Sequence, residues 1–464
     1  MLVVAIVTQN QAPLRAAAHD YAPQQAVLWQ GDSLEVRGQS ADYVQVYDHR
    51  RERAGYVKAA QIRQISLSPG AAPDLLAVVR FLRDTPGAEA LGISYAAAYL
   101  RAVAPEGLTA EPFDAIGVMA NRLAHRASLP QSPSSSATLA AHLDVVAEYG
   151  VVIKSYDRNG TVEVCYDGEM FRRVLAIRSA SPSQRATAAV SLTDNHCVDP
   201  LASAAAYYER LRWNAAILDS VPSTELSPEL RAVLKVKAAS VWAELAFEQA
   251  RRGATPQSSA NRALLELASV RKSDLSDQDC VDYADAAVRV GASRWAAEPA
   301  VVRAGPLLIR TTGGASGETC VLLLDADHDA NDPLVRRCTY ATVWPASAAS
   351  NPSGTALALA VQPLAAWREL WLFRRSAAGW TVTVIPPASD DVGVGYIEFA
   401  GWAPGGEQML TAREAMIDRH LRRSFEVVNI RSLVVERRSQ TPELLRAFNR
   451  WQDPNWRQGT VAVR

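Results

Sequence analysis

Several motifs common in metalloproteins and membrane proteins are missing from this chain of 464 residues. Its five cysteines form no C-x-x-C pair, which argues against a zinc site or a thioredoxin-like redox centre. The absence of H-E-x-x-H excludes a zincin protease. No apolar run reaches the roughly 18 residues that a membrane-spanning helix needs. The sequence therefore predicts no metal, no cofactor and no transmembrane segment.

The net charge is close to zero, and lysine is rare. The formal net charge is −1, so no overall field favours nucleic acid or an anionic membrane as a partner. Only five lysines accompany 43 arginines, a bias that, with so much alanine, is typical of a GC-rich bacterial genome. The opening MLVVAIV is too short for a signal peptide and lacks its basic start. We expect either a cytoplasmic protein or one whose export signal has been removed.

The first 63 residues show the pattern of short strands separated by tight turns. Apolar residues alternate in the strands LEV and YVQVYD, which indicates one buried face. Glycines in the intervening turns permit the backbone angles that a small barrel needs. An opening strand, a Leu14-Arg15 pair and a closing strand Gly55-Tyr56-Val57 complete the pattern.

These motifs resemble those of the bacterial SH3-type (SH3b) domain. The family commonly has Leu-Asn-Val-Arg where this chain has Ala12-Pro13-Leu14-Arg15, so this strand matches in part. The resemblance implies a small SH3-like β-barrel over residues 1–63. It also implies a module that holds a peptide or a wall polymer, since few members of the family are enzymes.

The resemblance places a ligand across aromatic residues between loops, because flat rings cover much area at little entropic cost. Alternation along YVQVY puts Tyr43 and Tyr47 on the face opposite Val44 and Val46. Basic residues beside exposed rings, including the run 49–51, would suit acidic peptides or wall carboxylates. In the alternative, Trp29 and Tyr56 simply fill the barrel. The predicted binding residues are Arg15, Tyr21, Tyr43, Tyr47 and Tyr56.

Residues 74–299 predict a mainly α-helical domain after a Ser/Pro/Gly-rich linker. The clearest helix has Ser227 as its N-cap and Pro228 at its first position, and Gly253 ends it. A hairpin is predicted near residues 150–167, because Asn159-Gly160 separates two alternating runs.

Residues 306–464 predict an antiparallel β domain with a helix near 442–452. Within it, residues 396–433 resemble one blade of a TolB-type propeller, on an aromatic strand followed by Trp402-Ala403-Pro404-Gly405-Gly406. That family usually has Asp in place of Gly405 or Gly406. We expect an incomplete propeller or a twisted meander, and for the whole chain a multidomain α+β fold.

The possible pairing of the cysteines bears on the compartment in which the protein resides. Cys320 and Cys338 lie on two strands joined by an acidic turn, so they are placed to form a disulfide. Cys165 and Cys197 form a second candidate bridge, which leaves Cys280 unpaired. In the alternative, all five are small buried thiols. Disulfides would indicate an oxidising compartment, such as the periplasm or cell envelope.

The sequence contains two candidate sites, one for a metal and one for catalysis. The segment 325–332 spaces oxygen ligands like a calcium loop, but Ala330 and Arg336 replace its essential Gly and Glu. A Cys-His site is an alternative, since Cys280 lies early in a predicted helix where the dipole lowers a thiol pKa. The later histidines, His328 and His420, lie in no matching strand motif.

The leading hypothesis is a non-catalytic extracytoplasmic bacterial binding or scaffold protein. Its SH3b module would recognise a peptide, peptidoglycan or another envelope protein. The alternatives are a cell-wall hydrolase or accessory factor with a Cys-His site, and a purely structural SH3-like cap.

Overall fold

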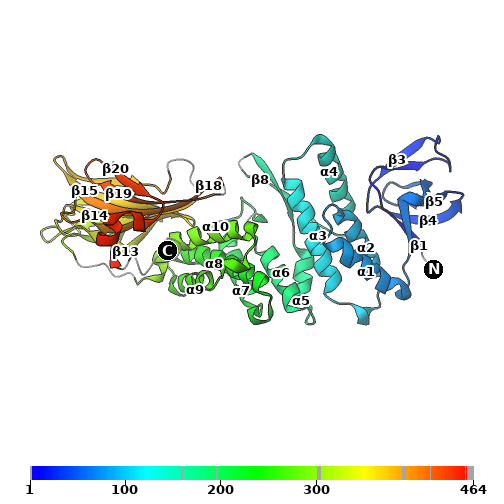
Figure 1. Ribbon diagram of the computed structural model, residues 1–464, viewed down its shortest axis with the longest axis horizontal. Coiled ribbons are helices and arrows are strands. Elements are labelled where there is room, and N and C mark those ends of the chain that lie inside the picture. The colour runs from blue at the N-terminus through cyan, green and yellow to red at the C-terminus, as the bar shows by residue number, and fades with distance from the viewer. Residues whose placement is uncertain are drawn as a thin grey trace. The chain divides into compact units, whose positions relative to one another are not determined.

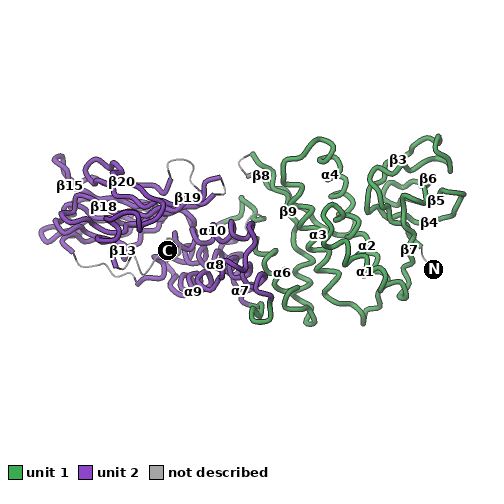
Figure 2. The backbone as a smooth tube through the Cα atoms, viewed as in Figure 1, with its two compact units in different colours: residues 1–203, 220–226 green, residues 204–219, 227–464 purple. Residues whose placement is uncertain are grey.

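The structure is a computed structural model that describes residues 3–158, 160–194, 197–299, 305–388, 393–418, 420–454 and 456. The chain forms two compact units (Figure 2). Unit 1 contains residues 1–203 and 220–226, and unit 2 contains residues 204–219 and 227–464. The element order changes from strands to helices and back to strands along the chain (Figure 1).

Unit 1 begins with a seven-stranded antiparallel sheet in the order β3-β2-β6-β5-β4-β1-β7. Its pairing ends at β3 and β7, so the described strands do not close into a barrel. Apolar residues at alternate positions, such as Leu14, Leu34, Val44 and Val46, fill one core on its inner face. The strands are β1 (Val3–Val7), β2 (Ala12–Arg15), β3 (Gln24–Leu28), β4 (Ser33–Ser40), β5 (Tyr43–Asp48), β6 (Arg53–Lys58) and β7 (Ile62–Ser66).

Six α-helices and a hairpin follow in the described part of unit 1. The hairpin strands β8 (Ile153–Arg158) and β9 (Thr161–Tyr166) pair as predicted, and Asn159 of its turn lies outside the described residues. Cys165 of β9 is bridged to Cys197, which confirms this disulfide. The helices are α1 (Ala72–Arg83), α2 (Glu89–Ala102), α3 (Glu111–Ser128), α4 (Pro133–Ala147), α5 (Glu169–Ala176) and α6 (Pro182–Leu192).

The N-terminal sheet is in direct contact with the helices of unit 1. Tyr149 Oη, just after α4, donates to the carbonyl of Gly31 at 2.6 Å. His142 Nε2 lies 2.7 Å from Asn10 Oδ1, and burial lowers the pKa of this histidine. These polar contacts hold the loops at one end of the sheet against α4.

The first four α-helices of unit 2 are α7 (Ala204–Asp219), α8 (Pro228–Arg251), α9 (Gln257–Ala268) and α10 (Asp277–Ser293). The Ser227 hydroxyl accepts from the Leu230 amide, which confirms the predicted N-cap of α8. Gly253 follows the helix with φ +68°, a conformation that suits glycine.

The C-terminal region contains two sheets. The larger one has eight strands in the order β13-β14-β15-β17-β18-β19-β20, with β16 paired to β15. A second sheet, β10-β11-β12, packs its apolar side chains on one face of β14 and β15. The strands are β10 (Leu308–Gly313), β11 (Thr319–Leu324), β12 (Val335–Thr339), β13 (Thr342–Ser350), β14 (Ala356–Leu364), β15 (Trp367–Ser376), β16 (Gly379–Ile385), β17 (Val394–Trp402), β18 (Gln408–Ile417), β19 (His420–Asn429) and β20 (Val435–Ser439).

The α+β class and the order of strand and helix regions agree with the sequence analysis, and two details differ. β15 and β17 pair in parallel, whereas an antiparallel region was predicted. The predicted helix 442–452 is split into a 3-10 turn (Pro442–Leu444) and α11 (Arg446–Trp451). The blade-like segment 396–433 supplies β17, β18 and β19, three consecutive strands of the larger sheet.

Cys320 and Cys338 are directly opposite in the β11–β12 ladder and form the second predicted disulfide. Their Cα atoms are 3.9 Å apart, closer than the usual disulfide range of roughly 4.4–6.8 Å.

Candidate functional site

Four of the five predicted binding residues lie on one face of the N-terminal sheet. Arg15 is directly opposite Tyr56, and Tyr56 is directly opposite Gln45. Tyr43 and Tyr47 flank Gln45 at two-residue spacing, so their side chains share its face. We call the surface formed by Arg15, Tyr43, Tyr47 and Tyr56 the outer face, because Val44 and Val46 between them point into the core.

The loop 16–23 folds over part of the outer face. Asp20 Oδ1 accepts from Tyr43 Oη and from Lys58 Nζ, each at 2.6 Å. The hydrogen bond from Lys58 is the main cause that lowers the pKa of Asp20, and the bond to Asp20 raises the pKa of Tyr43. Arg15 Nη1 holds the same loop by donating to the Ala22 carbonyl at 2.9 Å.

This arrangement gives two tyrosines opposite environments. Tyr43 is only 6% exposed and supports the loop, whereas Tyr21, on the loop itself, is 96% exposed. An exposed tyrosine on a loop that is held by hydrogen bonds is a suitable contact residue. Its ring can cover a large area of a ligand and loses little rotamer entropy on binding. Tyr43 therefore positions the loop, and Tyr21 is available to a ligand.

Tyr47 is half-buried beneath charged neighbours. The Arg37 guanidinium lies 4.1 Å from the centre of its ring, and the His49 ring packs edge-on at 4.8 Å. Both partners also bind Glu35, at 3.1 Å from Arg37 and 2.7 Å from His49. The hydrogen bond from Arg37 is the largest cause that lowers the pKa of Glu35. The ring is thus held in place between an ion pair and a histidine.

The basic residues that follow His49, predicted to lie beside the tyrosines, bind carboxylates of the sheet and of the helical part of unit 1. Arg50 Nε binds Glu148 at 2.8 Å, and Arg51 Nη1 binds Asp48 at 2.7 Å. Arg51 also binds Asp32, which is 2% exposed and whose pKa is raised by burial. Buried carboxylates need cationic partners, so these two arginines fix the turn and the contact with the helices.

Trp29 and Tyr56 were predicted, in the alternative, to fill the barrel. Neither belongs to the buried core cluster of the sheet, and both are half-buried. Tyr56 therefore remains on the outer face with Arg15, whereas Trp29 precedes the Gly31 loop, and its amide donates to Asp32 at 2.8 Å.

No family model, curated protein or solved structure matches this chain.

The alternative Cys-His site is not assembled in the described part of the chain. Cys280, on the first turn of α10, is exposed, so its expected burial was wrong. The described residues provide no hydrogen bond between its thiol and a histidine. His328 Nδ1 is bound to Asp325, and His420 Nδ1 to the Asp418 carbonyl, each at 2.7 Å. His196 lies outside the described residues.

The acidic turn 325–332 is organised by its own side chains. Asp325 Oδ1 accepts from the amides of Asp327 and His328, as in an Asx turn. Glu318 lies close to Cys320 and Cys338, but the two sulfurs are joined in the disulfide, so this group offers a metal a single carboxylate.

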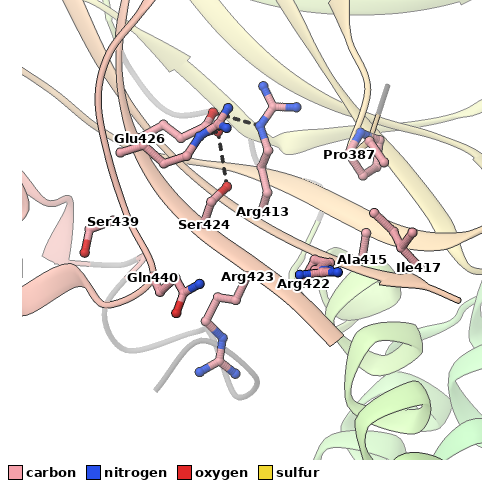
Figure 3. Close-up of a pocket in the computed structure, with 12 residues that line it drawn as sticks. Pro387, Arg413, Ala415, Ile417, Arg422, Arg423, Ser424, Glu426, Ser439 and Gln440 are labelled. Atoms are coloured by element: carbon pink, nitrogen blue, oxygen red, sulfur yellow. Dashed lines mark hydrogen bonds and ion pairs between the residues drawn. The ribbon is translucent and has the colours of Figure 1, made fainter. Parts of the chain in front are cut away.

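Sequence reasoning missed a polar cavity on the face of β18, β19 and β20 (Figure 3). Its signal in the sequence was a set of polar residues at two-residue spacing along two adjacent strands, Thr411 with Arg413 and Arg422 with Ser424. This pattern was hidden because the pairing of the strands was not known.

Proposed function

We propose that this protein is a non-catalytic extracytoplasmic binding or scaffold protein of bacteria. In this proposal the N-terminal sheet is an SH3b-like module that recognises a peptide or peptidoglycan. The observation that carries the proposal is the outer face, where Arg15, Tyr47 and Tyr56 lie together beside the loop that exposes Tyr21.

The covalent structure supports an oxidising environment. The two disulfides, Cys165–Cys197 and Cys320–Cys338, are typical of extracytoplasmic proteins. None of the described helices has an apolar stretch long enough to cross a bilayer. A periplasmic or cell-envelope location is part of the proposal.

The contact with the helices of unit 1 leaves the predicted binding residues unused. That contact is made by the loops around Asn10 and Gly31 and by Arg50. Tyr47 and Tyr56 take no part in these hydrogen bonds and ion pairs. Their rings, with the braced loop 16–23, are suited to lie against a sugar ring or an extended peptide.

The contact itself favours a second candidate, a structural cap. Gly31 approaches the Ala90 carbonyl so closely that an added Cβ would lie 2.7 Å from its oxygen. A sheet fixed so tightly to α2 and α4 is suited to complete the helical core. In this role the outer face would bind nothing.

Binding of the full-length chain to purified, insoluble bacterial peptidoglycan separates the two candidates. In a co-sedimentation assay we expect saturable binding of the wild type. The double variant Tyr47→Ala/Tyr56→Ala should bind at least about 10-fold more weakly, as expected for aromatic contact residues. Tyr340→Ala, which removes a tyrosine that is 69% exposed in unit 2, is the matched control.

Soluble muropeptides should compete with the insoluble material if the peptide-bearing units are recognised. Wild-type protein that binds neither form would favour the structural cap. Equal loss of binding in the double variant and in Tyr340→Ala would also exclude the outer face as the site.

A further inference from the structure

The polar cavity of the C-terminal sheet lies on one face of three neighbouring strands. Across β18 and β19, Thr411 is opposite Glu426, Arg413 is opposite Ser424, and Ala415 is opposite Arg422. Arg438 of β20 is in turn opposite Glu426. These side chains share one face because directly paired residues of a ladder point the same way. The cavity has a volume of about 570 Å³, within the range of small-molecule sites.

Glu426 organises the arginines of this face. It is fully buried, and its two oxygens accept from Arg413 Nε at 2.8 Å and from Arg438 Nη2 at 2.9 Å. Ser424 Oγ adds a third donor at 3.1 Å. One carboxylate thus fixes two guanidinium groups. Each guanidinium has five N–H donors, more in total than the oxygens of Glu426 can accept. Of the other N–H groups, Arg413 Nη1 donates to the Pro386 carbonyl and Arg438 Nε donates to Glu426, and the rest are left for a ligand.

Arg422 adds a third positive charge at the same place. It is exposed, and within the described residues no carboxylate lies at ion-pair distance from it. Its neighbour Arg423 also borders the cavity, but its charge is matched by the buried Glu414, to which it binds at 2.5 Å. In Figure 3, Arg413 and Arg423 extend in opposite directions from their strands. The cavity face therefore carries three arginines, Arg413, Arg422 and Arg438, and one carboxylate, Glu426, so it has an excess of positive charge.

Part of the cavity lining is apolar. Pro387, Ala388, Ala415 and Ile417 form it. An apolar wall beside guanidiniums suits a ligand that has both an anionic group and a hydrocarbon part, because each can be matched without leaving a polar group unpaired.

We infer that this cavity is a binding site for a small organic anion, one that carries a carboxylate or phosphate group next to a short apolar part. Arginine favours both head groups through paired N–H···O bonds. The head group would lie between Arg422, Arg413 and Arg438, and the apolar part against Ala415 and Ile417. This site is separate from the outer face of the N-terminal sheet and does not depend on its proposed function.

Titration calorimetry of the full-length protein tests the site with three probes: phenyl phosphate, benzoate and inorganic phosphate. At low ionic strength we expect saturable binding of phenyl phosphate or benzoate with a dissociation constant below about 1 mM. The probe that binds identifies the head group. Inorganic phosphate should bind more weakly because it lacks the apolar part.

The decisive variant is Arg422→Ala, because Arg422 is exposed and takes no part in the Glu426 cluster. It should weaken binding at least about 10-fold without lowering the melting temperature. Arg437→Ala is the matched control: it removes the same charge from an exposed position on β20, opposite Val427 on the other face. The control should bind within about twofold of the wild type. The inference is wrong if neither aromatic anion binds saturably, or if the two variants lose affinity equally.

Discussion

At the residue scale, the most demanding feature is a buried charge cluster between the eight-stranded sheet and the end of α10. Arg368 is fully buried, and burial lowers its pKa to about 10. Its Nη1 donates to the carbonyls of Gly291 and Ala292, at 2.6 and 3.0 Å. Glu398 is the carboxylate shared by Arg368 and the buried Arg294. One carboxylate thus compensates two buried guanidiniums.

Glu398→Gln should therefore destabilise the protein by about 3–5 kcal/mol, because it leaves two buried cations without a carboxylate. Urea unfolding at pH 7 measures the change. Glu443→Gln, at an exposed position, is the control and should change the unfolding free energy by less than about 0.5 kcal/mol. A similar small change in both variants would show that the cluster is not a stabilising element.

Glu414 makes stability depend on pH. Burial raises its pKa from 4.5 to about 7, although Arg423 and Tyr396 both contact it. The folded state then holds a proton that the unfolded state has released. Stability contributed by this group is complete below about pH 4.5 and falls, by on the order of 3 kcal/mol, as the pH rises to about 7.

In Glu414→Gln this fall should disappear, since the amide does not titrate. Unfolding free energies at intervals from pH 4.5 to pH 8 would show a flatter profile than that of the wild type. An unchanged slope would mean that Glu414 is ionised in the folded state throughout this range.

Some of these residues were predictable from sequence and others were not. Alternation along YVQVY placed Tyr43 and Tyr47 on one face, because a strand has a fixed period of two. The same pattern does not reveal that Asp20 covers Tyr43, since a loop contact depends on tertiary structure. The buried Arg368 and Glu398 look like surface residues in the sequence, because their burial follows from packing against α10.

At the scale of elements, the contact between the N-terminal sheet and α2 is central to the choice between a binding module and a structural cap. Gly31 has φ +96°, and a Cβ there would lie 2.7 Å from the Ala90 oxygen and 3.0 Å from Val145 Cγ1. Tyr149 then donates to the Gly31 carbonyl. Only glycine allows both the backbone angle and the close approach.

Gly31→Ala should destabilise unit 1 by roughly 1–3 kcal/mol, because it combines a strained backbone with a clash against main-chain atoms. Chemical unfolding followed by tryptophan fluorescence measures the loss. Gly70→Ala is a suitable control, since no atom lies within 4 Å of the added Cβ. Equal stability of the two variants would indicate that the sheet does not pack tightly on α2.

Helix limits show why capping motifs predict some elements better than others. Ser227-Pro228 marks the start of α8, and its side-chain bond to Leu230 is present. Asp199-Pro200 carries a similar signal, yet α7 begins at Ala204. There the Asp199 side chain accepts from the Leu201 amide and forms a local turn instead. The two outcomes cannot be separated by local sequence, because tertiary packing selects between them.

At the scale of the whole molecule, the disulfides connect the fold with the proposed compartment. Thiol titration of denatured, non-reduced protein from an oxidising compartment should give one free thiol per chain, that of Cys280. After reduction the number should rise to five, the total in the sequence. Five free thiols before reduction would contradict both bridges and the extracytoplasmic location.

The central claim is that the outer face of the N-terminal sheet binds a peptide or peptidoglycan. Hydrogen–deuterium exchange of the full-length protein, with and without soluble muropeptides from purified peptidoglycan, tests it most directly. The account predicts slower exchange in residues 12–23 and 43–58, which contain β2, the Tyr21 loop, β5 and β6, and unchanged exchange in β10 to β16. Exchange that is unaltered everywhere, or slowed only outside the N-terminal sheet, would contradict it.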